Sequence, residues 1–238
     1  MIYETPWLLP NISDCYFYHS ITLTDSFSIS GDWDLRPVVD SYLSDYNFNR
    51  KRVLDVGTAT GFLSFHCEAR GAQVVSFDHS NLFPVNTIPG WPENPDGFTR
   101  MKNGYWFAHS ALRSSNKVIY GNIYDLPQPV VSYQFDVAIL GSVLMHLENP
   151  FGALRSASKV AKTLIITETH RPYIDTDHAV FRPGMKDGND YLAWWYLPIK
   201  TVINMLRSLG YSTSEPTMLT AHGKAGSVDL YSIVATTD

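Results

Sequence analysis

A glycine-rich turn between two apolar segments carries residue types suited to binding a ligand. Residues 53–56 are apolar except for one acid, the turn spans Gly57 to Gly61, and a second apolar run at 74–77 is followed by Asp78. Glycine lets backbone approach a ligand because no Cβ intrudes. A carboxylate only accepts hydrogen bonds, so Asp78 suits the two hydroxyls of a ribose. This order of residues is typical of a βαβ unit that binds a nucleoside, although the G-x-G-x-x-G of dinucleotide sites is absent.

Two further segments follow apolar runs in the same way. Gly121-Asn122-Ile123 comes after the run at 117–120, and Gly141 comes after the run at 135–140, with His146 five residues further on. Ligands of open α/β folds bind at the carboxyl ends of parallel strands. We therefore expect these segments to lie beside the glycine-rich turn.

With Asp55 just before it, the turn resembles the first motif of the class I S-adenosylmethionine (SAM)-dependent methyltransferases. The acid after the second run, the segment after 117–120 and the segment after 135–140 resemble that family's next three motifs in order and spacing. The resemblance implies an α/β fold with a Rossmann-like, seven-stranded sheet, helices on both faces and an antiparallel C-terminal hairpin. It also implies SAM as the cofactor.

The resemblance assigns cofactor binding to ten residues near the expected strand ends. They are Asp55, Gly57, Thr58, Gly61, Phe62, Asp78, His79, Asn122, Ile123 and Gly141. Asp55 is expected to hold the cofactor's ammonium group or to brace the turn, and Asp78 to bind the ribose. Asn122 stands where related enzymes often place an acid that receives the adenine amino group. Ile123 is expected to pack on adenine, with plain core packing as its alternative, and backbone at Gly141 is expected to face the sulfonium.

Two histidines are candidates for catalysis. His146 follows the expected strand at 135–140, and His170 follows the one at 163–167. A neutral imidazole near the methyl group could remove a proton from a hydroxyl or amine nucleophile. The alternative for each is a structural role in capping or packing.

Five residues are expected to line the acceptor pocket. They are Tyr18, Trp33, Arg36, Trp194 and Trp195. Aromatic rings could wall a planar or apolar substrate, and an arginine could pair with a carboxylate of the acceptor or cofactor. Alternatively, several of these aromatic residues only attach the N-terminal and late segments to the sheet.

The sequence alternates strand and helix patterns, as expected for an α/β sheet. Expected strands are 52–56, 73–77, 117–120, 135–140 and 163–167, with a closing pair at 215–220 and 227–236; expected helices are 37–43, 61–70, 99–114, 150–160 and 197–209. We also expect a short strand within 16–23 and irregular insertions at 81–98 and 169–195. The predicted organisation is an N-terminal extension, 1–46, covering the active site of a methyltransferase domain, 47–238.

Several segments resemble a narrower group, the methyltransferases related to the tRNA wobble-uridine (carboxy)methyltransferases. These segments are 18–23, 33–37, 54–58, 121–126 and 144–150. The resemblance implies a lysine in those tRNA enzymes that recognises the carboxylate of carboxy-SAM. This chain has His19 and Ser20 in the corresponding region, which favours SAM over carboxy-SAM as the cofactor. Its net charge of −5 also argues against a large phosphate-binding face.

We therefore predict methyl transfer to an oxygen or nitrogen of a small, partly apolar or aromatic molecule, with nucleic acid not a partner. The alternatives are a tRNA-modifying methyltransferase of the same fold and a non-catalytic SAM-binding module. Cys15 and Cys67 form no metal or redox motif, so no metal is expected. The start lacks a signal-peptide pattern and no apolar run is long enough to span a membrane, which predicts a cytoplasmic protein. The pattern does not indicate an oligomeric state.

Overall fold

The computed structural model describes residues 3–6, 8–80, 95–174, 176–182 and 193–237. Five parallel strands form the centre of its main sheet: β4 (Arg52–Val56), β5 (Gln73–His79), β6 (Lys117–Gly121), β7 (Phe135–Gly141) and β8 (Ala161–Thr169). They lie in the order β6-β5-β4-β7-β8. Each sequence-predicted parallel strand is therefore present, and β5 continues two residues further so that Asp78 and His79 belong to it.

The C-terminal part completes the sheet with antiparallel strands. β13 (Gly226–Thr236) pairs with β8, and β12 (Thr217–Gly223) pairs with β13, which confirms the predicted closing hairpin. Two short strands also join: β3 (Trp33–Asp34) on β12 and β11 (Ser212–Thr213) on β13. The sheet therefore has nine strands where the sequence predicted seven. Two-residue strands leave no alternation in a sequence, which is why the pattern missed them.

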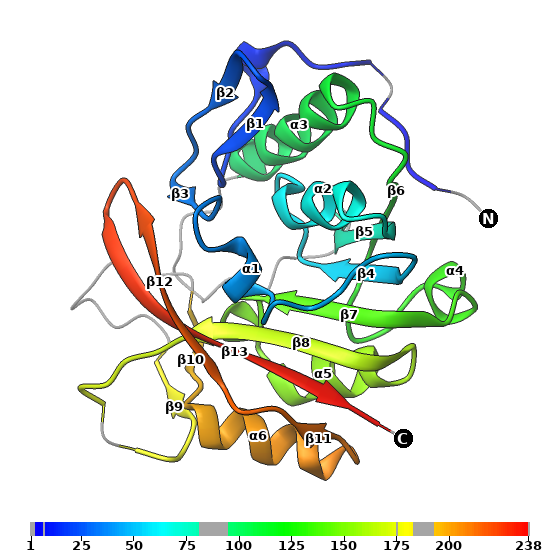
Figure 1. Cartoon of the computed structure of the whole chain (residues 1–238). Coiled ribbons are helices and arrows are strands. Elements are labelled where there is room, and N and C mark those ends of the chain that lie inside the picture. The colour runs from blue at the N-terminus through cyan, green and yellow to red at the C-terminus, as the bar shows by residue number, and fades with distance from the viewer. Residues whose placement is uncertain (1–2, 7, 81–94, 175, 183–192, 238) are drawn as a thin grey trace.

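Helices cover both faces of the sheet, as predicted. On one face lie α1 (Val39–Tyr42), α2 (Phe62–Ala69) and α3 (Pro95–Ala111); on the other lie α4 (Gln128–Val131), α5 (Pro150–Ser158) and α6 (Ile199–Ser208) (Figure 1). Helix α1 is shorter than predicted at both ends: residues 37 and 38 form a turn before it, and the chain leaves it at Leu43, ahead of the left-handed φ angles of 52° at Ser44 and Asp45. Helix α3 begins earlier than predicted, and the rest of the predicted insertion at 81–98 lies outside the described residues.

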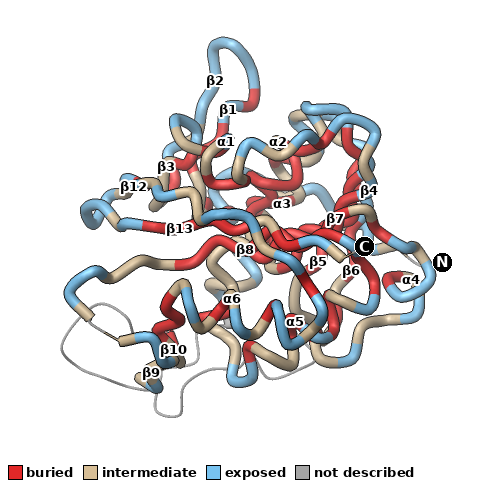
Figure 2. The backbone as a smooth tube through the Cα atoms, turned by 60° about the horizontal axis from the view of Figure 1, so that its bottom comes forward, coloured by how far each residue is buried: buried red, intermediate tan, exposed pale blue. Residues whose placement is uncertain are grey.

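The strand sequences are apolar because both faces of the sheet are buried. Along β4, Val53 packs toward α1 and α2, and Leu54 packs with the cluster that includes α5 and α6. Both side chains have no exposed surface. The buried part of the chain is concentrated in the central strands, as Figure 2 shows. This rigid centre fixes the ends of the parallel strands relative to one another.

The N-terminal segment lies along α3. Besides the single turn η1 (Ile12–Asp14), it contains a hairpin of β1 (Ile21–Thr24) and β2 (Phe27–Ile29), so a strand forms over only part of the 16–23 segment. The Tyr16 amide donates to the Arg100 carbonyl at 2.9 Å. In the late segment, β9 (Val180–Phe181) pairs with β10 (Trp195–Tyr196). Among the described residues, no helix has the length and apolar character required to cross a membrane.

Candidate active site

The carboxyl ends of the five parallel strands meet at one edge of the sheet. The strand register sets Val56 beside Phe77 and Leu140, and it sets His79 beside Gly121. In Figure 1, β4, β7 and β8 point to the left of the view, where β3, β10 and the tip of the β12–β13 hairpin also lie. All ten residues predicted to bind the cofactor are in or next to these strand ends.

The glycine-rich turn between β4 and α2 requires its glycines. Gly57 and Gly61 have φ angles of +75° and +85°. Residues other than glycine rarely adopt this region of backbone conformation. A Cβ on Gly57 would lie 2.8 Å from Val143 Cγ2, and one on Gly61 would lie 2.5 Å from the Phe65 ring. The turn is thus packed against neighbouring elements on both sides.

Asp78 connects the turn to the end of β5. Its Oδ2 accepts a hydrogen bond from the Ala59 amide at 2.8 Å, and its Oδ1 accepts one from the His79 amide at 2.7 Å. Each carboxylate oxygen can accept more than one hydrogen bond. Asp78 therefore holds the turn and still has the capacity to accept from a pair of hydroxyl groups. The His79 ring packs edge-on to Phe98, with centroids 4.8 Å apart.

Asp55 is the buried acid beneath the turn. Its side chain is 1% exposed, and its Oδ2 accepts from the Ser64 hydroxyl at 2.6 Å. The Ser64 hydroxyl also lies within hydrogen-bond distance of the Thr58 and Ser76 hydroxyls. Burial raises the pKa of Asp55 to about 6, although the Ser64 and Thr58 hydroxyls favour the charged form. Its Oδ1 is buried without a hydrogen-bond partner among the described residues, so a cationic group there would compensate the charge.

The remaining predicted cofactor residues frame the same edge. Asn122 Oδ1 accepts from the Tyr124 amide at 2.9 Å, which shapes the turn after β6. Ile123 is 8% exposed and packs among the buried residues of the core on the α4, α5 and α6 face of the sheet. A Cβ on Gly141 would lie 2.9 Å from the Tyr42 hydroxyl, so the end of β7 requires a glycine as well. Phe62 begins α2, and its ring centroid is 5.8 Å from that of His19.

Both candidate catalytic histidines lie at this edge. His146 ends η2 (Leu144–His146), the single turn after β7, and its amide donates to the Val143 carbonyl at 3.0 Å. His170 follows β8, and its amide donates to the Asp229 carbonyl of β13 at 2.7 Å. Both residues are partly exposed. The structure therefore presents them at the ends of neighbouring strands, one from β7 and one from β8.

The late segment forms an aromatic group beside η2. The rings of Phe181 and Trp194 stack with centroids 6.1 Å apart and an interplanar angle of 28°. The Trp195 ring lies 4.9 Å from Phe181, and its Nε1 donates to the Glu148 carbonyl at 3.2 Å. The amide of Trp194 donates to the Met145 carbonyl at 2.8 Å. Phe181, which the sequence analysis did not select, thus joins the two predicted tryptophans.

The predicted residues of the N-terminal extension have different surroundings. The Trp33 amide donates to the Tyr18 carbonyl at 3.0 Å, so these two segments are held together. Arg36 is exposed and forms a two-point ion pair with Asp34, with contacts of 2.8 and 2.6 Å. This pairing lowers the pKa of Asp34. The Arg36 guanidinium, predicted to face a carboxylate of the acceptor or cofactor, is thus paired within its own segment.

The sequence analysis also did not consider Tyr42, Ser142 and Glu168 at this edge, and it did not select His19 as a site residue. Ser142 has a φ angle of 53°, and its hydroxyl lies 3.0 Å from that of Tyr42. His19 has a buried Nδ1 without a partner among the described residues, and burial lowers its pKa to about 4. Glu168, in β8, is 1% exposed, and burial raises its pKa to about 8. A signal existed for Glu168: like Asp78, it is an acid directly after an expected strand, here 163–167.

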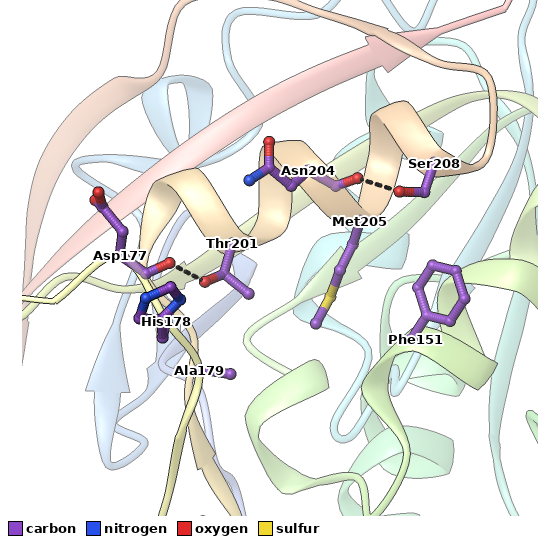
Figure 3. A pocket seen from close by; sticks show the side chains of 8 residues that line it. All are labelled: Phe151, Asp177, His178, Ala179, Thr201, Asn204, Met205 and Ser208. Carbon is purple, nitrogen blue, oxygen red and sulfur yellow. Dashed lines mark hydrogen bonds between the residues drawn. The ribbon is translucent and has the colours of Figure 1, made fainter.

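A separate hollow of about 310 Å³ lies between α5, α6 and residues 177–179 (Figure 3). The Thr201 hydroxyl on α6 donates to the Asp177 carbonyl at 2.6 Å, which connects the two walls. None of the predicted site residues lines this hollow. It is therefore distinct from the candidate active site at the strand ends.

Comparison with known proteins agrees with the fold and the motifs. Residues 34–211 match the family described as a methyltransferase domain, which covers most of the chain. The chain therefore belongs to this family and is a class I SAM-dependent methyltransferase. No match was found among curated proteins.

Solved methyltransferase structures share the fold at low sequence identity. Magnesium protoporphyrin IX methyltransferase from Synechocystis PCC 6803, with bound S-adenosylhomocysteine (SAH), is 16% identical, with a TM-score of 0.55 and coverage of 86% of this chain and 82% of that one. The Burkholderia thailandensis 1,6-didemethyltoxoflavin-N1-methyltransferase is 15% identical, with a TM-score of 0.57 and coverage of 86% and 78%. A putative RNA methyltransferase from Pyrococcus horikoshii is 12% identical, with a TM-score of 0.51 and coverage of 84% and 80%.

Proposed function

We propose that this methyltransferase acts on an oxygen or nitrogen nucleophile of a small, partly apolar or aromatic molecule. The observation that carries the proposal is the aromatic group of Phe181, Trp194 and Trp195, which packs beside η2 where β7 ends. Aromatic walls with few polar groups are typical of sites for small ligands. Two of the structural neighbours have printed names of small-molecule methyltransferases, which agrees with this class of acceptor.

The residues at the strand ends fit SAM. In the proposed arrangement Asp78 accepts from the ribose hydroxyls, Asp55 Oδ1 compensates the ammonium group directly or through water, and Asn122 receives the adenine amino group. The glycines of the turn leave room for the methionine part. The remaining contacts are proposed for Thr58, Phe62, His79, Ile123 and Gly141.

SAM supplies an electrophilic methyl group on its sulfonium. The protein's contribution is then mostly positioning, since a well-oriented nucleophile removes much of the entropic barrier. A base is needed only when the acceptor carries a proton at the working pH. His146 is the proposed base, with His170 as the second candidate, because both lie at the edge where the methyl group would be presented.

The N-terminal extension, residues 1–46, is proposed to cover the site of the domain formed by 47–238. Support comes from His19, whose ring lies 5.8 Å from that of Phe62. Tyr18 and Trp33 would then contribute to the acceptor pocket from this side. Arg36 would face the acceptor only by leaving Asp34, so its proposed contact depends on that ion pair opening.

The rival proposal is a tRNA substrate, which the resemblance to the wobble-uridine enzymes suggests. Two cations near this edge are paired with acids: Arg36 with Asp34, and Lys224 with Asp32. Together with the net charge of −5, this disfavours a phosphate-binding face. Bulk tRNA is expected to bind weakly at physiological salt. Sub-micromolar binding that falls steeply with salt in a fluorescence titration would reverse the ranking.

The direct test is a methylation screen. The purified chain is first titrated with SAH by calorimetry, and then incubated with SAM and a panel of phenols, carboxylic acids, aromatic amines and nitrogen heterocycles. SAH formation coupled to a methylated product in mass spectrometry supports the proposal, with Asp78→Ala as the matched control. SAH binding without turnover on any acceptor or on tRNA would favour a non-catalytic module instead.

A further inference from the structure

Glu168 is a buried acid that contacts the turn after the neighbouring strand. It lies in β8 one residue before the strand's end, and its side chain is 1% exposed. Its Oε1 accepts hydrogen bonds from two backbone amides of η2, that of Leu144 at 2.8 Å and that of Met145 at 3.3 Å. The side chain of one strand thus caps the turn that follows the next strand.

Those two amides need an acceptor from the protein. Leu144 has no exposed surface and Met145 is 7% exposed. The amides at the start of a helical turn have no partner inside the turn, and a buried amide without a hydrogen bond is unfavourable. Glu168 is the group that satisfies both, so the position of η2 depends on it.

The turn η2 positions two groups at the acceptor side. His146 is its last residue. The carbonyl of Met145 accepts from the amide of Trp194 at 2.8 Å, which attaches the aromatic group to the same turn. A shift of η2 would therefore move the candidate base and the aromatic wall together.

We propose that Glu168 is a positioning residue for methyl transfer: by capping η2 it holds His146 and Trp194 in their working places. The proposal rests on the proposed function in one respect, the roles given to His146 and Trp194. It assigns Glu168 no contact with the substrate, because its carboxyl is enclosed by β8, η2 and Tyr231 of β13, its partner in the strand register.

The chemistry of the carboxyl supports a capping role. Burial raises the pKa of Glu168 to about 8, while the amides of Met145, Leu144 and Thr169 oppose this effect. A negative charge on Glu168 would raise the pKa of two other groups, Tyr42 on α1 and Tyr231 on β13. Burial is the larger cause of the raised pKa of both tyrosines. The raised pKa favours the neutral carboxyl, which caps η2 through Oε1, while Oε2 is buried without a hydrogen-bond partner among the described residues. A glutamine side chain has a neutral acceptor oxygen and the same length.

The test compares Glu168→Gln, Glu168→Leu and Glu168→Asp in the full chain. Hydrogen exchange of the amides in residues 142–149 is followed by mass spectrometry and NMR, which needs no acceptor. Glu168→Gln is expected to exchange at these amides no faster than wild type. Glu168→Leu is expected to raise exchange at Leu144 and Met145 at least about tenfold, with β4 unchanged. The aspartate side chain in Glu168→Asp is too short to reach both amides. This variant therefore provides the test if Glu168→Leu does not fold.

A second measurement uses the acceptor found in the screen. Glu168→Leu is expected to lower kcat/KM for the acceptor about 100-fold, the effect of a small misplacement of reacting groups. Glu168→Gln should stay within about threefold of wild type, and SAH affinity should stay within about threefold in both. The matched control is Asn116→Leu, which removes a buried amide just before β6, away from the strand ends.

The outcomes separate this inference from the proposed function. Unchanged protection of Leu144 and Met145 in the leucine and aspartate variants overturns the capping role, whatever the acceptor. Equal loss of kcat/KM in the glutamine and leucine variants overturns it as well, because it would point to a need for the acid itself. An equal loss in Asn116→Leu would mark the effect as general destabilisation and also count against the proposal.

Discussion

Replacing Glu168 with glutamine is expected to make the protein less sensitive to alkaline pH. The folded state holds the pKa of Glu168 at about 8, whereas its ordinary value is 4.5. Between these values the folded state binds the proton and the unfolded state releases it. Folding is therefore favoured at acid pH, and stability is lost as pH rises from about 4.5 through about 8. Glutamine does not titrate, so the variant lacks this loss.

The interval between the two pKa values sets the size of the effect. Each pKa unit corresponds to about 1.4 kcal/mol, so the wild type loses up to about 5 kcal/mol relative to Glu168→Gln once the carboxyl is fully ionised. For a chain of 238 residues, this corresponds to a difference of roughly 10–20 °C in Tm. The glutamine oxygen still caps Leu144 and Met145, so the variants should be similar near pH 4.5.

Equilibrium urea unfolding at pH 4.5, 7 and 9 measures the difference directly. The free-energy difference between Glu168→Gln and wild type should grow with pH and level off above about 8. Asp55, whose pKa burial raises to about 6, is present in both proteins and cancels. Glu148→Gln, at an exposed position, is the matched control and should show no such growth. Parallel pH profiles for Glu168→Gln and wild type would refute the reasoning.

Four further predictions concern the cofactor site and catalysis. Asp78→Ala should weaken SAH binding by about 1.5–3 kcal/mol in calorimetry, as expected for lost hydrogen bonds to a charged group; unchanged affinity would count against the ribose contact. Gly57→Ala should destabilise by about 1–3 kcal/mol because of its φ angle and the 2.8 Å approach to Val143, and adding Val143→Ala should recover part of the loss in urea unfolding. SAM affinity should rise with pH through about 6, the pKa of Asp55, with proton release that Asp55→Asn abolishes in buffers of different ionisation enthalpy. His146→Ala should lower kcat by ~10²–10⁴ at unchanged SAH affinity if His146 is the base, whereas a loss of stability alone would assign it a packing role.

The sheet could be predicted from the sequence because each central strand is buried on both faces. A segment such as β4 then becomes a short apolar run, and the glycine at its end marks where the strand stops. The same logic located the closing hairpin of β12 and β13. It failed for β3, which gains its partners only when the chain ahead of α1 reaches the tip of that hairpin. Such pairing leaves no local pattern.

The cofactor edge could be predicted for a related reason. Parallel strands carry their carboxyl ends to one edge, so residues just after each apolar run must gather there. The rule predicted that Asp78, Asn122 and Gly141 lie at this edge, as they do, whereas their contacts with SAM stay predictions. The hydrogen-bond and ion-pair partners of the side chains could not be predicted in this way. Arg36 looks available in the sequence, but its guanidinium reaches back two residues to Asp34, and the sequence does not show whether an exposed arginine is already paired.

Glu168 was missed by the sequence analysis, although it also follows an expected strand. The rule that selected Asp78 applies equally to an acid in the last positions of β8, yet the two carboxyls differ in what they contact. Asp78 accepts from the glycine-rich turn and stays partly exposed, whereas Glu168 accepts from η2 and is enclosed by β13. Both strands have a neighbour on each side, so strand order alone does not separate the two acids. Their exposure separates them: a partly exposed acid at a strand end can bind a ligand, whereas Glu168, which is 1% exposed, can serve the ligand through the turn that it holds.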